Sequence, residues 1–285
     1  MRLSAILLLY RSRPWMEGCL RTLVPALRRV DGGCGVVLVD QDSGDGAVEF
    51  AEEFLRREGI PFLTLKPGKN LGVAGGRNLG ARAPWPQPPD WLLFLDTDTE
   101  LPAPAVLNEL LAAAAAHPRA ALLGPKLVTG DIAAPVLQRS ARHFPRPLDL
   151  AANWLGRKGL PGFAARARRY HLDDFDFSRA RPVPWLAGAC QLLRREAFAS
   201  LGGFAPEFFY GLEETDHCLR LWLSGHEVWF IPCGPLHHHT QRLSSRSLRF
   251  LLLHARSALR YFIRHHSDTP DAERRHEAAL AQLAS

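Results

Sequence analysis

Two carboxylates follow an apolar, strand-like segment at a spacing that suits a divalent cation. The segment covers residues 91–95, and the acids are Asp96 and Asp98. Because side chains alternate faces along an extended chain, both carboxylates can point the same way. Such carboxylates hold Mg²⁺ or Mn²⁺, which take their remaining ligands from water and substrate phosphates. The alternative is a polar turn or helix cap, in which Asp98 or Thr99 opens the helix expected at 105–116.

The first hundred residues alternate between short apolar runs and segments with helical spacing. Strands are expected at residues 3–9, 35–39, 61–65 and 91–95, and helices at 16–29, 47–57 and 74–82. Near-continuous apolar strands that alternate with helices predict a parallel sheet covered on both faces. Right-handed crossovers then give a doubly wound, nucleotide-fold-like half.

Each of these four strands leads into polar or glycine-rich residues. The exits are Tyr10 and Arg11, Asp40 to Asp42, Asn70 to Gly76, and Asp96 to Asp98. Ligands of such sheets bind beyond the carboxyl ends of the strands, so the four exits are expected to meet at one edge. Their convergence favours a cation and phosphate site over a simple cap.

Length and cysteine usage limit the class of protein. A chain of 285 residues can form one α/β domain with a C-terminal elaboration. Its five cysteines are scattered without a CxxC pair, which favours a reducing compartment and argues against a disulfide framework or a zinc ribbon. The apolar run at residues 3–10 is too short to span a bilayer, so a cytoplasmic protein is expected.

Positive charge is concentrated in one part of the chain. The net charge is +6, and residues 139–181 contain ten Lys or Arg against four Asp. Basic surfaces attract phosphates, anionic lipid or nucleic acid. A solvated surface explains any single arginine, whereas for the cluster we favour a functional role. The many prolines after residue 130 predict long connections and a mobile flap.

The last part of the chain regains regular patterns. Ordered segments are expected at 185–193 and 195–200, helices at 213–223 and 248–264, and a strand at 228–231. The final helix gathers apolar residues near one face, namely Leu251, Leu252, Ala255, Leu259 and Phe262. We expect this face to pack against the domain, and a membrane-surface role is the alternative.

The order of the motifs resembles the family 2 glycosyltransferases of GT-A fold, in particular the rhamnosyltransferase-like branch. Residues 37–46 are similar to the family's VDNxSxDG signature, with Gln41 in the Asn position, and residues 70–80 to its NxGxxGGxNxG segment. Tyr10 ends the first strand as in the family, although Arg11 replaces the usual Asn. Residues 188–198, 201–204 and 208–221 resemble the acceptor-side block and the Glu-Asp motif.

The resemblance covers residues 3–245 and implies a fold. It implies an α/β GT-A fold whose mainly parallel, Rossmann-like sheet has helices on both faces, with a C-terminal helical extension. The GT-A domain would occupy residues 1–240, with a nucleotide-binding half at 1–130 and an acceptor-side half at 131–240. Residues 241–285 would form the helical extension, packed on the same domain.

The resemblance also implies which residues bind the nucleotide sugar. These are Tyr10, Asp40, Gln41, Gly72, Gly75, Asn78, Asp96 and Thr97. In this assignment Asp40 accepts a hydrogen bond from the imide N–H of uracil or thymine, and Tyr10 stacks in the base pocket. A turn-capping Asp40 and a buried structural Tyr10 are the alternatives. The glycines allow close approach of the backbone and a tight helix entry.

For the metal, the resemblance implies Asp98 as a ligand, with Asp96 facing ribose or metal-bound water. A histidine after the 228–231 strand would join them. His237 and His239 share a face if the chain is extended, so they are selected from the run of three histidines. A zinc site is not expected, because no Cys or carboxylate lies at ligand spacing.

For catalysis, the family's Asp falls on Glu214, with Glu213 and Asp216 beside it. An acceptor hydroxyl is a poor nucleophile until its proton is removed, so an inverting transferase needs a carboxylate base. Adjacent acids can raise one pKa toward neutrality, which suits a base. A helix N-terminus simply enriched in acids is the alternative.

The implied activity is inverting, metal-dependent transfer of a sugar from a UDP- or dTDP-sugar, such as dTDP-rhamnose. The acceptor would be a hydroxyl of a lipid-linked or polysaccharide glycan of the cell envelope, reached by peripheral contact with the inner face of the cell membrane. A catalytically silent nucleotide-binding scaffold that docks on membranes is the alternative from another class. A nucleotidyltransferase is less favoured, because the chain lacks a basic glycine-rich N-terminal loop. Nucleic-acid binding has only the net charge behind it and is not expected.

Overall fold

The computed structural model describes residues 2–149, 152, 163–173, 175–240 and 247–284. Its centre is an eight-stranded sheet in the order β10-β13-β6-β12-β4-β1-β2-β3. The strands are β1 (Leu3–Leu9), β2 (Cys34–Asp40), β3 (Phe62–Leu65), β4 (Trp91–Leu95), β6 (Ala120–Gly124), β10 (Arg181–Pro182), β12 (Cys190–Arg194) and β13 (Glu227–Phe230).

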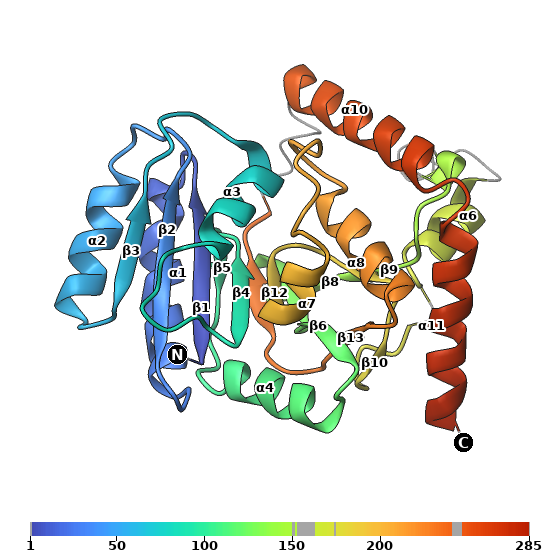
Figure 1. Cartoon of the computed structure of the whole chain (residues 1–285), viewed down its shortest axis with the longest axis horizontal. Helices are drawn as coiled ribbons and strands as arrows, with labels where there is room; N and C mark the ends of the chain where they lie inside the picture. Colours follow the sequence, from blue (N-terminus) through green and yellow to red (C-terminus); the bar gives the residue numbers. More distant parts are fainter. Residues whose placement is uncertain (1, 150–151, 153–162, 174, 241–246, 285) are drawn as a thin grey trace.

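Helices cover both faces of this sheet, as predicted (Figure 1). One face packs on α1 (Arg13–Arg28), α2 (Ala47–Arg57) and α4 (Val106–Ala116). The other packs on α3 (Gly72–Ala81), α7 (Arg195–Ser200) and α8 (Glu213–Leu223). Alternate strand residues enter the two cores, since side chains along a strand alternate faces: Leu93 and Leu95 point to the first core, Leu92 and Phe94 to the second.

The N-terminal half of the sheet is parallel. Strands β3, β2, β1 and β4 pair in parallel, and β1 and β4 are almost completely buried. Such burial on two faces explains their continuous apolar sequences. The α/β prediction is therefore confirmed, and four polar strand exits lie at the same edge.

The sheet is mainly parallel, as expected, but its second half also contains antiparallel strands. Strand β12 runs antiparallel to both β4 and β6, while β13 runs parallel to β6. Cys190 pairs with Leu95, so β12 begins where β4 ends. Residues just before β12 therefore lie beside the Asp96 exit. The apolar pattern of residues 185–193 could not show this, because strand direction does not depend on that pattern.

Smaller sheets flank this edge. One has the order β5-β14-β7-β8, formed by β5 (Thr99–Glu100), β14 (Leu236–His238), β7 (Leu127–Asp131) and β8 (Ala134–Gln138). Another pairs β9 (Ala141–Arg142) with β11 (Trp185–Leu186). In the first, His238 pairs with Thr99, which places the histidine run directly beside the Asp96 to Asp98 turn.

Two helices end the described chain, α10 (Leu248–Arg264) and α11 (Thr269–Ala284). In Figure 1, α10 lies along the top and α11 runs down to the C-terminus. Tyr261, Ala272 and Ala279 join the second core. None of the described helices is both long enough and apolar enough to cross a membrane.

The face of α10 that was expected to pack is largely exposed, although Phe262 of that face does pack against the second core. Leu251, Leu252 and Leu259 are 50%, 61% and 62% exposed. The buried positions of α10 are Ser257 and Tyr261. Hydrophobic periodicity located the helix correctly, but it could not show which side of the helix packs against the rest of the chain.

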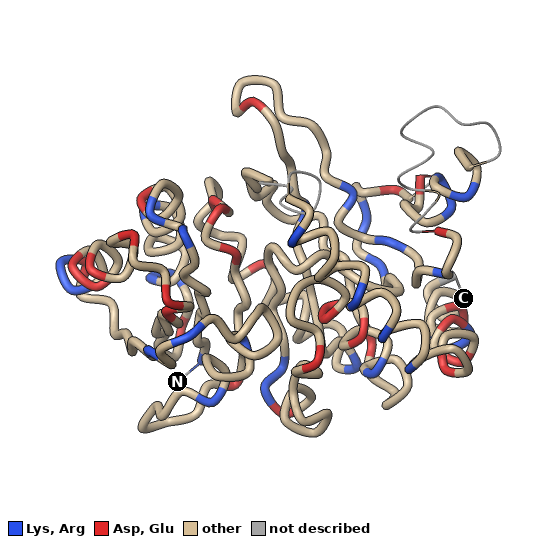
Figure 2. The backbone as a smooth tube through the Cα atoms, turned by 90° about the horizontal axis from the view of Figure 1, so that it is seen from above, with Lys and Arg blue, Asp and Glu red and all other residues tan. Residues whose placement is uncertain are grey.

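Most arginines of the basic segment have acidic partners. A helix in this segment, α6 (Phe163–Tyr170), contributes Arg166 and Arg169, which pair with the buried Asp149. Arg139 pairs with Asp173. Figure 2 shows Lys and Arg interspersed with Asp and Glu over the backbone. Ion pairing accounts for the placement of much of this cluster, and its functional role stays a prediction.

Candidate active site

A pocket of about 410 Å³ lies at the carboxyl ends of the parallel strands. Eight of its residues come from the four predicted strand exits, namely Tyr10, Gln41, Asn70, Gly72, Val73, Asp96, Thr97 and Asp98. The second half of the chain adds Phe209, Tyr210, His238, Thr240 and Phe250. The structure therefore brings the sequence-predicted exits together around one cavity.

The glycine-rich loop is held in place by Gln41. This side chain is buried; its amide donates to the carbonyl of Gly72 at 2.9 Å, and its oxygen accepts from the backbone N–H of Leu71 at 2.8 Å. Gly76 leaves the space that Gln41 occupies, because a Cβ there would lie 2.1 Å from the amide nitrogen. Gln41 therefore ties the end of β2 to the start of α3.

Gly72 makes a second close contact, to the other half of the chain. Its φ is +72°, and a Cβ would lie 2.4 Å from the backbone oxygen of Phe209. The same oxygen accepts a hydrogen bond from the backbone N–H of Val73 at 2.8 Å. Only glycine combines this left-handed conformation with so close an approach.

Other residues that were predicted to bind the nucleotide instead make structural contacts around the pocket. Asn78 is buried and exchanges two hydrogen bonds with the backbone of Phe204. Gly75 sits against the side chain of Leu71, and Asp40 accepts the backbone N–H of Ser43 at 3.0 Å, a turn-capping contact. None of Asp40, Gly75 and Asn78 lines the described pocket.

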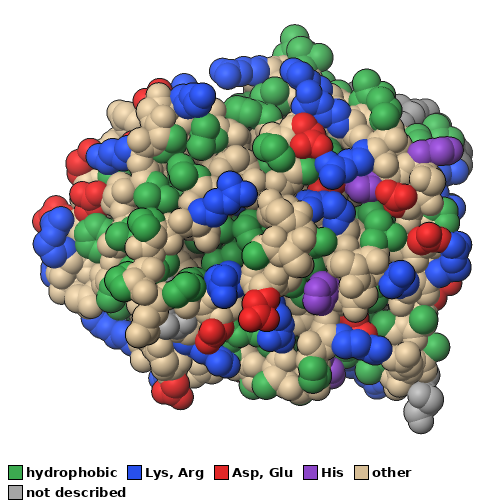
Figure 3. All heavy atoms as spheres, viewed as in Figure 1, with side chains coloured by type: hydrophobic (Ala, Val, Ile, Leu, Met, Phe, Trp, Pro, Cys, Tyr) green, Lys and Arg blue, Asp and Glu red, His purple; other side chains and the backbone are tan. Residues whose placement is uncertain are grey.

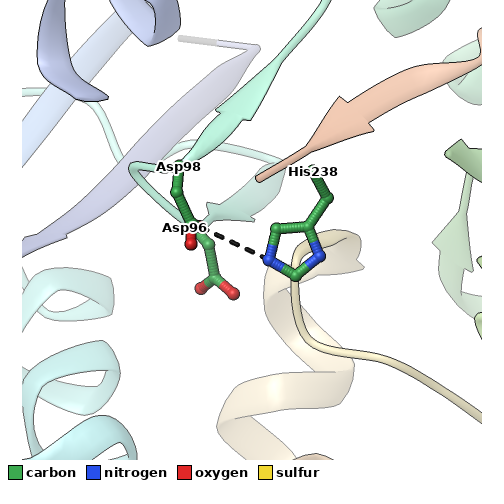
Figure 4. Close-up of side chains that lie close together, drawn as sticks. All are labelled: Asp96, Asp98 and His238. Carbon is green, nitrogen blue, oxygen red and sulfur yellow. Dashed lines mark ion pairs between the residues drawn. The ribbon is translucent and has the colours of Figure 1, made fainter. Parts of the chain in front are cut away.

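A candidate cation site lies on one wall of this pocket (Figure 4). Ligand atoms of Asp96, Asp98 and His238 all lie within 4.8 Å of one another, and His238 Nε2 is 3.4 Å from Asp98 Oδ1. Two carboxylates and one imidazole form a donor set that suits Mn²⁺, and also Mg²⁺ with added water.

The histidine differs from those selected in the sequence. His237 Nε2 lies 3.0 Å from the carbonyl of Gly130, and His239 Nε2 lies 2.9 Å from Glu100 Oε1. The rings of His237 and His239 do lie together, with their centres 4.3 Å apart, but the candidate ligand group contains His238 instead. The register of β14 against β5, which three identical residues cannot reveal, selects His238.

Burial and nearby charges shift the pKa values of Asp96 and His238. Desolvation raises the pKa of Asp96; the nearby Arg77 guanidinium opposes this shift, and the Asp98 charge adds to it. Burial lowers the pKa of His238, but its hydrogen bond to Asp98 and the two aspartate charges outweigh this and raise it overall. A cation at this position would relieve the repulsion between the two carboxylates.

Arg77 is a site residue that the sequence reasoning missed. It is 3% exposed; Nη2 donates to Asp96 at 3.0 Å and to the carbonyl of Gly188 at 2.8 Å. Its Nη1 is buried without a hydrogen-bond partner among the described residues. A charged residue inside the glycine-rich run was the available signal, since such groups are rarely buried without a purpose.

A second pocket of about 320 Å³ adjoins the first. The two share Val73, Asp96, Tyr210 and His238. The second is also lined by the acids Glu213 and Glu214 and by the cations and aromatics Arg77, Arg142, Tyr170, Trp185 and His254.

The two glutamates of this pocket differ in environment. Glu213 is 4% exposed, and desolvation together with the Glu214 charge raises its pKa well above the ordinary value. Glu214 is half-buried. The Oε2 atom of each lies buried without a hydrogen-bond partner among the described residues. Carboxylate oxygens that lack protein partners are free to bind a substrate hydroxyl.

Asp216 lies apart from both pockets. It is fully buried, and its carboxylate accepts hydrogen bonds from Arg220 Nε and His265 Nε2, both at 2.8 Å. These partners hold the pKa of Asp216 below its ordinary value, although burial alone would raise it. Asp216 therefore joins α8 to the end of α10, a structural contact rather than the catalytic one expected.

Comparison with known proteins agrees with this geometry. A sequence model described as Glycosyl transferase family 2 matches residues 4–202. The chain belongs to this family. It is therefore a glycosyltransferase, as the motifs predicted. The N-acetylglucosaminyl-diphospho-decaprenol L-rhamnosyltransferase of Mycobacterium tuberculosis is 29% identical over 283 residues, which cover 93% of this chain and 85% of that protein.

Solved structures share the fold of this family member. The mannosyltransferase PcManGT from Pyrobaculum calidifontis, in complex with GDP-Man and Mn²⁺, has a TM-score of 0.61 at 18% identity, covering 99% of this chain and 75% of that one. GalNAc-T7 with UDP, GalNAc and Mn²⁺ has a TM-score of 0.61 at 16% identity, covering 84% of this chain and 44% of that one. At these identities the likeness concerns the fold, which is the predicted GT-A fold.

Proposed function

We propose that this glycosyltransferase is inverting and metal-dependent and transfers a sugar from a UDP- or dTDP-sugar to a hydroxyl of a lipid-linked or polysaccharide acceptor. The observation that carries the proposal is the junction of the two pockets. Asp96 and His238 line both, with the cation candidate site on one side and Glu213 and Glu214 on the other.

The first pocket suits the donor. Tyr10 and Gln41 lie at its base-binding end by analogy with the family motif, and Asp98 and His238 lie where a diphosphate would follow. When bound, Mn²⁺ or Mg²⁺ there would neutralise negative charge on the leaving diphosphate. The Arg77 guanidinium behind Asp96 orients that carboxylate and adds a fixed positive charge.

The second pocket suits the acceptor. Glu214 removes the proton of the acceptor hydroxyl as its oxygen bonds to the anomeric carbon, while the bond from that carbon to the diphosphate oxygen breaks. Attack from the side opposite the leaving group inverts the anomeric centre. Burial and the neighbouring Glu214 charge raise the pKa of Glu213, which favours its protonated form as a hydrogen-bond donor in the same cavity.

The relative that acts on a decaprenol-linked N-acetylglucosamine suggests where the reaction occurs. A lipid-linked acceptor and dTDP-rhamnose are therefore the first substrates to test, in cell-envelope glycan synthesis at the inner face of the cell membrane. Arg142 lines the second pocket and lies over Trp185, 5.1 Å from the ring centre, which suits a sugar or phosphate of such an acceptor.

The test is transfer from a panel of nucleotide sugars in the presence of Mn²⁺ or Mg²⁺, followed by mass spectrometry of the product. Thermal unfolding with UDP, dTDP and GDP identifies the base, because the bound nucleotide stabilises the fold. Transfer with inversion that is lost with EDTA and in Glu214→Gln supports the proposal. Retention of anomeric configuration, or full activity of Glu214→Gln, would contradict it.

A further inference from the structure

The outward side of α10 is a continuous apolar band. It consists of Leu248, Leu251, Leu252, Leu259 and Ile263, which are 71%, 50%, 61%, 62% and 72% exposed. At about 100° per residue these positions fall within one third of the helix circumference. Single exposed leucines are ordinary, but a contiguous band of this size marks an interaction surface.

Positive charge borders this band on one side. Arg249 and Arg256 are exposed and form no ion pair within the described part of the chain. Arg260 and Arg264, further along the same side, contact Glu207. Figure 3 shows hydrophobic and Lys or Arg side chains next to one another along the top of the molecule, where α10 lies.

The inward side of α10 covers the active site. Phe250 lines the donor pocket and packs against Tyr210 with ring centres 4.9 Å apart. His254 lines the acceptor pocket, and Ser257 donates to the backbone oxygen of Tyr210 at 3.0 Å. Whatever binds the outer side of α10 therefore lies one helix diameter from the substrates.

We propose that α10 is a membrane-docking helix whose apolar band enters the interface of an anionic lipid bilayer. An apolar band flanked by unpaired arginines matches such a surface, where lipid tails meet anionic headgroups. A symmetric dimer that packs two antiparallel α10 helices through the same band would bring Arg249 and Arg256 of the two copies together, which like-charge repulsion disfavours. The benefit to an acceptor anchored in lipid rests on the proposed function, but the docking itself does not.

The test is flotation of the full chain with vesicles of phosphatidylcholine alone or with added phosphatidylglycerol. The apolar arm compares Leu252→Glu/Leu259→Glu with Leu283→Glu. This control changes a leucine that is 51% exposed near the end of α11, which runs away from α10 to the C-terminus. The double variant should lose binding at least about tenfold, and the control should bind as the wild type does.

The charge arm compares Arg249→Ala/Arg256→Ala with Arg29→Ala/Arg82→Ala, two exposed arginines outside α10. Each arginine near an anionic surface contributes roughly fivefold in affinity, so the α10 pair should lose about 25-fold at low salt. Binding should also weaken as salt is raised. The other pair should change binding little.

Sugar transfer to a water-soluble acceptor, measured in the same variants, distinguishes the membrane-docking proposal from the proposed glycosyltransferase activity. Retained transfer with lost flotation supports the docking role, and absence of transfer in every variant would count against the proposed function alone. Circular dichroism checks that α10 still folds. The docking role is overturned if the wild type does not float, if Leu252→Glu/Leu259→Glu floats unchanged, or if that variant only converts a dimer to a monomer.

Discussion

The contact between Gly72 and Phe209 gives a quantitative prediction. Gly72→Ala places a methyl group 2.4 Å from the backbone oxygen of Phe209 and keeps the residue at a φ of +72°. Gly46→Ala is a matched control, because Gly46 also has a positive φ, +77°, but nothing lies within 4 Å of its added Cβ. Both glycines stand at the start of a helix.

The magnitude follows from two contributions. Left-handed backbone costs an alanine about 1–2 kcal/mol, of which roughly 0.4–1 kcal/mol is offset because alanine restricts the unfolded chain. Overpacking against a backbone atom adds about 1–3 kcal/mol in Gly72→Ala only. We therefore expect a loss of about 1 kcal/mol for Gly46→Ala and about 3 kcal/mol for Gly72→Ala.

Urea unfolding at equilibrium measures both free energies, and calorimetric titration with the preferred nucleotide measures the effect on the donor pocket. Gly72→Ala should also weaken nucleotide binding, because Gly72 lines that pocket, whereas Gly46→Ala should leave it unchanged. If the two variants differ in stability by less than about 0.5 kcal/mol, the clash is relieved without cost and the reasoning is refuted.

Three further predictions concern chemistry and pH. Glu214→Gln should lower kcat by about 10² to 10⁴-fold with little change in donor affinity. Glu213→Gln, which keeps a hydrogen-bond donor at that position, should lower kcat far less. Steady-state kinetics compares the two variants, and equal losses would reverse the assignment. His238→Ala should raise the Mn²⁺ concentration that gives half-maximal rate by at least about tenfold, whereas His239→Ala should leave it unchanged. If His238→Ala also leaves this concentration unchanged, His238 is not a metal ligand. His217 is fully buried, and desolvation lowers its pKa from 6.5 to about 3, so the unfolded state binds its proton first as pH falls. As pH falls from 6.5 to about 3, this group should lower the free energy of unfolding by about 1.4 kcal/mol per pH unit, measured by urea unfolding, and His217→Leu should flatten the decrease.

Features that depend on local sequence were predictable. The helices at 47–57, 213–223 and 248–264 and the strand at 91–95 match the structure residue for residue. Apolar runs, helical spacing and helix ends all depend on residues that are close in sequence. The meeting of four strand exits followed from these elements together with the rule that parallel strands end at one edge.

Features set by contacts between distant segments were not predictable. Nothing near His238 in the sequence distinguishes it from its two neighbours. The register between β14 and β5 makes the choice, because it pairs His238 with Thr99, 139 residues earlier in the chain. The roles of Asp216 and Arg77 depend on partners on other elements, His265 and Gly188. Likewise, the exposed side of α10 depends on where the rest of the chain lies.

The strand order has a consequence for how the chain folds. β6, at residues 120–124, lies between β13 and β12, which come about 70 to 110 residues later, while β12 also borders β4. Neighbouring strands in the middle of the sheet therefore come from segments that lie far apart in the sequence. A fragment ending at residue 130 would leave one side of β4 and both sides of β6 without their partner strands. Such open, strongly apolar strand edges promote aggregation. The two substrate pockets are therefore built on one cooperative folding unit, and neither half is expected to be recovered as a soluble, stable piece.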